Sequence, residues 1–171
     1  TSGTVTAAQI KGNLKLTSTS GTLKATGIEG NVEARLTSGN AYLENISGSV
    51  NYESTSGSLD AKNIDGELNV RLTSGNAKIE NAKKLGQLYF TSGNMRAVNS
   101  GLGANTQFTG TSGNFTIETT SDLKSFNYLL KASSGNLRVG GSSGTKTLEL
   151  NNNASTWIKG NITSGHITIE N

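Results

Sequence analysis

A Ser-Gly pair recurs at a constant interval through the first half of this 171-residue chain. The glycines of these pairs are Gly3, Gly21, Gly39, Gly57, Gly75 and Gly93. A second glycine follows halfway through each of the first four intervals, at Gly12, Gly30, Gly48 and Gly66. A fixed period is the sequence signature of a repeat architecture. The chain is therefore expected to fold as one array of repeated units, each running from one Ser-Gly glycine to the next.

Each unit is expected to carry two short strands. If the Ser-Gly glycine is position 1, apolar residues fall at positions 3, 5, 8, 12 and 14, and the pairs 3/5 and 12/14 alternate with polar neighbours. Such alternation is typical of a strand with one buried face. Gly or Asn at positions 1, 7 and 10 tolerates the left-handed backbone that a sharp bend requires. Because only 32% of residues are hydrophobic and 22 are Gly, the core must be thin and built from small aliphatic side chains.

Two architectures accommodate two strands per unit: a solenoid of parallel coils and an antiparallel meander. In a solenoid, residues one unit apart lie over one another at about 4.8 Å, so like charges should not recur within a column. The column at position 15 reads Thr17, Arg35, Glu53, Arg71, Tyr89, and its charges alternate in sign. A meander gives no reason for this column. We therefore expect an all-β fold, a parallel β-solenoid (β-helix) of 18-residue coils, with right-handed winding favoured over left-handed. Arg35, Glu53 and Arg71 are expected in a structural ladder.

A segment that recurs two units apart indicates how the core is packed. The segment RLTSGNAYLEN (35–45) has a near copy two units further along, RLTSGNAKIEN (71–81). Large side chains stacked on large ones would overcrowd a core, and small on small would leave voids. At positions 16, 3 and 5, one unit has a large residue at position 3 and small residues at 16 and 5, and the next unit has the reverse. The successive units read Ser18/Leu23/Ala25, Leu36/Ala41/Leu43, Ser54/Leu59/Ala61 and Leu72/Ala77/Ile79. This alternation predicts two coil types whose side chains interdigitate, with Leu59 stacked between Ala41 and Ala77.

The domain organisation follows from the same spacing. We predict a single β-solenoid domain over 1–171, with regular coils in 1–93 and irregular, expanded coils plus a C-terminal cap in 94–171. About nine coils at about 4.8 Å each give a rod roughly 40 to 45 Å long, with parallel strands throughout. The chain begins inside a repeat, at TSGT, and we expect a fragment whose targeting segment lies outside this sequence. No stretch approaches the roughly 20 apolar residues of a membrane span.

The recurrent pattern TSGN-A-x-φ-E-N-I-x-G-x-φ, with φ an aliphatic residue, covers nearly the whole chain. It resembles a bacterial adhesin-like family of unknown function, which also supplies the β-rich half of some envelope-stress proteins. The resemblance implies a β-solenoid attached to membrane-anchored or surface-associated bacterial proteins. It implies no catalytic residues. From it we expect a noncatalytic binding or spacer module at the bacterial cell surface or envelope.

A carbohydrate-active β-helix enzyme is the competing class. A glycosidase needs two carboxylates that flank the sugar bond, whereas most of the 12 acidic residues here fall in expected outward ladders beside Lys or Arg. The single histidine, His166, supplies neither a His-rich metal site nor a convincing triad, and there is no cysteine. Basic residues are spread out, without the basic stripe and aromatic platforms of a nucleic-acid binder. We therefore expect no catalytic, metal or cofactor site and no nucleic-acid partner, and an envelope polymer or a protein as candidate partner.

After Gly93 the Ser-Gly glycines come at Gly113, Gly135 and Gly165, with a spacing that grows at each step, so extra chain is expected to leave the coils. The extra chain falls in SDLKSFNYLLK (121–131) and TKTLELNNNASTWIKG (145–160). Loops on a rigid scaffold are where binding concentrates, which makes Lys124, Tyr128 and Lys131 the candidate partner-binding residues. A solenoid must also cover its terminal coil, and we assign Trp157 to that cap.

Overall fold

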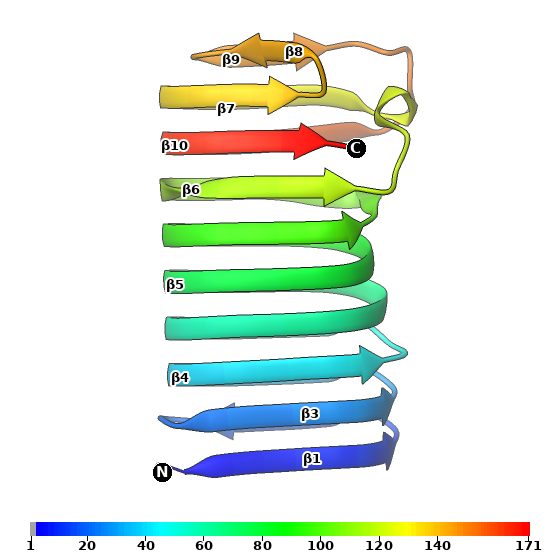
Figure 1. Ribbon diagram of the computed structural model, residues 1–171, viewed down its shortest axis with the longest axis vertical. Helices are drawn as coiled ribbons and strands as arrows, with labels where there is room; N and C mark the ends of the chain where they lie inside the picture. The colour runs from blue at the N-terminus through cyan, green and yellow to red at the C-terminus, as the bar shows by residue number, and fades with distance from the viewer. Residues whose placement is uncertain (1–2) are drawn as a thin grey trace.

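The computed structural model, which describes residues 3–171, is a stack of β-coils with its long axis along the direction of stacking (Figure 1). Most of the described chain is extended, and β5 alone runs through 51 residues because the ladder continues around the corners of the coil. The elements are β1 (Thr4–Lys11), β2 (Leu14–Ser18), β3 (Thr22–Glu29), β4 (Val32–Ile46), β5 (Val50–Ser100), β6 (Leu102–Thr119), the short 3-10 helix η1 (Leu123–Ser125), β7 (Asn127–Val139), β8 (Ser142–Gly144), β9 (Thr147–Leu150) and β10 (Trp157–Glu170).

Successive regular coils pair in parallel, and each residue lies opposite its counterpart in the next unit. Leu23 on β3 pairs with Ala41 on β4, which pairs in turn with Leu59 on β5. The same register continues within β5, where the Asn81 side chain donates to Asn63 at 3.0 Å. The prediction of an all-β parallel solenoid is therefore confirmed, and the meander is excluded for these coils.

The core has the alternating composition that the sequence predicted. Ala41 lies between Leu23 and Leu59, and all three side chains are at most 2% exposed. At position 16, Leu36 pairs with Ser54, whose hydroxyl donates to the carbonyl of Ser56 at 3.2 Å and so is satisfied inside the core. Small residues thus make room for large ones in the coils above and below, as close packing requires.

The same exchange of volume continues beyond the regular coils with aromatic residues. Phe115 packs edge-on against Phe90, with ring centroids 5.6 Å apart. Gly110 occupies position 16 in this coil, and a Cβ there would approach the Phe115 ring to 3.1 Å. The absence of a side chain at Gly110 therefore leaves room for the Phe115 ring.

The Ser-Gly glycines form one continuous column along the rod. At each step a Cβ on the glycine would overlap the carbonyl oxygen of the glycine in the adjacent coil, and most of these glycines have φ between +107° and +143°. Only glycine combines that backbone with such a close approach. The column passes through Gly3, Gly21, Gly39, Gly57, Gly75, Gly93, Gly113, Gly165 and Gly135.

The last three members of that column show that stacking order departs from chain order. β10 lies between β6 and β7, and it pairs in parallel with both (Figure 1). The end of the rod beyond β7 is covered by β8 and β9, which pair with β7 in antiparallel fashion. The expectation of parallel strands throughout is therefore wrong at this end. The long spacings after Gly113 accommodate this order. After β6 the chain leaves one level of the stack open and forms β7, pairs back on β7 through β8 and β9, and then fills the open level with β10.

Candidate functional site

A groove of about 780 Å³ runs along one face of the rod, beside the Ser-Gly corner. Its floor is formed by position 3 residues such as Ala41 and Leu59, and outward side chains at positions 2 and 4 border it. We call these borders the amide row and the mixed row. The amide row consists of Asn40, Ser58, Asn76, Asn94, Asn114 and His166. The mixed row consists of Tyr42, Asp60, Lys78, Arg96, Thr116 and Thr168.

The amide row is held in place by hydrogen bonds along the rod axis. The backbone N–H of Asn94 donates to Asn76 Oδ1 at 3.2 Å, and the Asn114 side chain donates to Asn94 Oδ1 at 2.8 Å. The backbone N–H of His166 donates to Asn114 Oδ1 at 3.1 Å. Asn76, Asn94 and Asn114 therefore present held amide groups on three successive coils, so little of their side-chain entropy remains to be lost when a ligand binds.

The mixed row carries charge and one aromatic ring. Tyr42 is 44% exposed, and the Lys24 ammonium lies 5.7 Å from the centre of its ring. Lys78 bonds Glu80 at 2.7 Å, and Arg96 is ion-paired with Glu118. Asp60 is the single carboxylate among the residues that line the groove. The row thus offers a stacking surface and two cations beside the amides.

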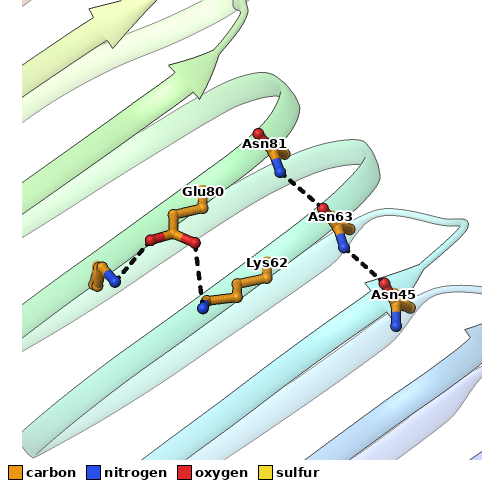
Figure 2. A network of polar contacts seen from close by, with 6 residues as sticks. Asn45, Lys62, Asn63, Glu80 and Asn81 are labelled. Atoms are coloured by element: carbon orange, nitrogen blue, oxygen red, sulfur yellow. Dashed lines mark hydrogen bonds and ion pairs between the residues drawn. The ribbon is translucent and has the colours of Figure 1, made fainter.

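The cations of this face belong to ion-pair ladders that cross the coils. Glu80 accepts from both Lys78 and Lys62, the latter at 3.2 Å (Figure 2). The hydrogen bond and charge of Glu80 raise the pKa of Lys78 above its ordinary value, and the bonds from Lys78 and Lys62 lower the pKa of Glu80. Each group therefore stays charged over a wider pH range than it would alone.

An asparagine ladder lies next to these ion pairs, at the bend of each coil. Asn63 donates to Asn45 Oδ1 at 2.8 Å, and Asn81 donates to Asn63 Oδ1 at 3.0 Å (Figure 2). All three residues have positive φ, between 54° and 56°, a left-handed conformation that Asn tolerates better than most residues. Position 7 was expected to need such a backbone, and the structure adds that its side chains bond along the rod.

The residues expected in the structural ladder at position 15 lie on a different face. Arg35 contacts Glu33 at 3.1 Å and Glu53 at 3.6 Å. The Arg71 guanidinium instead lies 4.5 Å from the centre of the Tyr89 ring. The two acids that come close together here, Glu33 and Glu53, are thus bridged by a shared arginine.

The candidate partner-binding residues have different environments. Lys124 lies in η1 and Lys131 on β7, and both are exposed. Tyr128 is completely buried in the core of β7, so it presents no surface to a partner, and its expected place in a surface loop is wrong. Burial, together with the charge of Asp122, raises the pKa of Tyr128 to about 12. Trp157, assigned to the cap, instead begins β10 and pairs with Asn127 inside the stack.

Sequence reasoning missed the groove and the role of His166. Insertion of β10 places His166 between Asn114 and Asn136. There the groove meets a second hollow of about 670 Å³, which is lined on its far side by Arg138 and Thr145. His166 directly follows Gly165 as Asn40 follows Gly39, which was a signal in the sequence, but its neighbours depend on the order of stacking.

Neither a metal centre nor a membrane-crossing helix is found in residues 3–171. No three His, Asp or Glu side chains among them come together in a way that would hold a metal ion. No helix in this part of the chain has the length and apolar character needed to cross a membrane.

Comparison with known proteins gives one match. Residues 65–170, more than half of the chain, match the model of a family described as Toastrack DUF4097. No curated protein and no solved structure matched the chain.

Proposed function

This chain belongs to the Toastrack DUF4097 family, a family of unknown function, and from that premise we propose a noncatalytic binding or spacer module of the bacterial cell surface or envelope. The rod holds an extended partner along the groove. The surface location rests on the resemblance of the repeats to adhesin-like bacterial proteins.

The observation that carries the binding role is the continuity of the groove across six coils. Its amide row offers donors and acceptors at every coil, and Tyr42, Lys78 and Arg96 add a ring and two cations. These groups suit an extended, hydroxyl-rich or anionic polymer, which can contact several coils at once. Several weak contacts on one chain combine into useful avidity because later contacts form at high effective concentration.

The carboxylates of the molecule favour binding over glycoside hydrolysis. Hydrolysis needs two acids on opposite sides of a sugar bond, one of them free to act as proton donor. Asp60 is the one acid that lines the groove, and Glu33 and Glu53 are both engaged by Arg35 on another face. The carbohydrate-active enzyme is therefore the second candidate, and it is tested in the same experiment.

The test is cosedimentation of the purified chain with bacterial envelope fractions. Arg96→Ala and Tyr42→Ala remove contacts from the mixed row, and Arg35→Ala is the matched control. Arg35 and Arg96 are similarly exposed, with side chains 57% and 58% accessible, and each pairs with a carboxylate. We expect the two groove variants to lose retention and the control to keep it. Equal retention by all three would contradict the groove, and release of reducing sugar ends from the envelope would favour the enzyme.

A further inference from the structure

β10 fills an interior level of the rod that the preceding chain leaves open. β6 and β7 do not pair with each other, and β10 bonds to both over nearly its full length. Its inward side chains Ile158, Ile162, Ile167 and Ile169 are at most 1% exposed. We call the space that β10 occupies the slot.

The slot is selective for the sequence of β10. A Cβ at Gly160 would approach Leu130 Cδ2 to 2.7 Å and Ile167 Cδ1 to 2.8 Å. At Gly165, where φ is +124°, a Cβ would overlap the carbonyl oxygen of Gly113. An occupant therefore needs glycine at the position of Gly165, where the obstacle is backbone, and a small residue at Gly160 leaves the side-chain ends of Leu130 and Ile167 in place.

Both ends of β10 are secured by asparagines, and none of these contacts is covalent. At the start, the Asn127 side chain donates to the carbonyl of Ala154 at 2.7 Å and accepts from the N–H of Asn152 at 2.8 Å. At the end, the Asn171 side chain donates to the carbonyls of Thr119 and Ser121 at 3.1 and 2.8 Å. The slot thus recognises a strand with its flanking residues, whichever chain supplies them.

An empty slot would be costly for the rod. The facing edges of β6 and β7 would each expose a row of unpaired backbone groups, which promotes pairing with another chain. β10 is tethered to β9 only by the polar segment 151–156, NNNAST. Six extended residues reach at most about 20 Å, so two rods that exchange β10 must lie with their slots close together.

We propose that the slot accepts β10 from a second copy of the chain, so that two rods join by reciprocal exchange of their last strands. Domain exchange of this kind reuses the contacts that β10 itself makes in the closed chain, although not those of the hinge 151–156, so it needs no new complementary surface. The inference is independent of the proposed partner of the groove.

The experiment uses two full-length variants, Thr109→Cys and Asn161→Cys. Thr109 on β6 and Asn161 on β10 are register partners at position 15, where side chains point outward. Neighbouring strands lie about 4.8 Å apart, within the Cα separation that a disulfide spans. The natural chain has no cysteine, so disulfides form only at the introduced positions. Peptide mapping distinguishes the crosslink between positions 109 and 161 from the two homodimers of equal mass.

The two variants are unfolded in urea, mixed, refolded together at high concentration and oxidised. We expect a crosslinked heterodimer of about twice the mass of the 17.7 kDa chain that reductant dissociates. The matched control replaces Thr109→Cys by Glu53→Cys, which also lies at position 15 but far from the slot, and it should give no such heterodimer. A doubly substituted chain, with both cysteines, verifies that the pair bonds within one molecule at low concentration.

Two results would overturn the inference. One is a heterodimer yield no higher than that of the Glu53→Cys control. The other is a doubly substituted chain that crosslinks only within itself at every protein concentration, since this would mean that β10 always enters its own slot.

Discussion

The alternating core makes a quantitative prediction about Ala41 and Leu59, which face each other in adjacent coils. Ala41 is 1% exposed between two leucines, so Ala41→Leu inserts a branched side chain into filled space and should lower the free energy of unfolding by about 1 to 3 kcal/mol. Leu59→Ala alone empties a site that is 2% exposed and should cost about 2 to 5 kcal/mol. Together the two changes keep the total volume of the column nearly constant, but residue 41 still faces Leu23, so only part of the loss is recovered. We expect the double variant to be about 1 to 2 kcal/mol more stable than the sum of the single losses predicts.

Urea unfolding of the four proteins, followed by circular dichroism, measures this coupling. The control cycle combines Ala41→Leu with Leu88→Ala, because Leu88 is equally buried but lies two coils away. Distant sites should give additive losses within about 0.5 kcal/mol. Additivity in the Ala41/Leu59 cycle as well would refute the interdigitated core.

Three further predictions concern single residues. Gly75→Ala should lower the free energy of unfolding by more than about 2 kcal/mol, because φ is +136° and a Cβ would overlap the coil below, whereas Gly141→Ala, with nothing within 4 Å, should be nearly neutral in the same urea assay. Asn63→Ala should cost about 1 to 2 kcal/mol by breaking both bonds of the ladder, and Asn63→Gly should cost less because glycine keeps the left-handed backbone. The Tyr128 hydroxyl is buried without a hydrogen-bond partner, so Tyr128→Phe should raise the free energy of unfolding by about 1 kcal/mol at neutral pH. Its folded pKa of about 12 exceeds the ordinary 10, so the folded state keeps this proton between pH 10 and 12 while the unfolded state loses it. The free energy of unfolding should therefore fall as the pH rises from 10 to 12, and pH-dependent melts should show a smaller fall in the phenylalanine variant.

The regular coils could be predicted from the sequence because their constraints repeat in register. Stacking like charges, or leucine on leucine, in adjacent coils would destabilise the fold. The alternation of charge and size along each column therefore shows which residues pair between coils. Tyr128 could also have been placed correctly. It lies seven residues before Gly135, as the buried Val32 lies seven residues before Gly39, and this spacing marks it as an inward residue.

The insertion of β10 could not be predicted in the same way. The segments that start at Gly135 and Gly165 carry the same local pattern, and the spacing from Gly113 to Gly135 also suits direct stacking of β7 on β6. Which strand follows β6 is decided by side-chain fit, for example by Ile162 beside Gly110. The groove escaped prediction for a related reason, since it depends on the shape of the face and on the neighbours that β10 brings.

The position of β10 also bears on how the protein is synthesised. β7 ends at Val139, but its partner β10 is complete only at Glu170, so the whole segment 140–170 must still be synthesised when Val139 has just been added. At about 5 to 20 residues per second, the ribosome needs about 2 to 6 s to deliver the missing strand. Throughout that interval β6 and β7 both expose open edges on the nascent chain. A chaperone that shields extended backbone would therefore be most useful in this interval, after the cap has formed and before the rod is continuous.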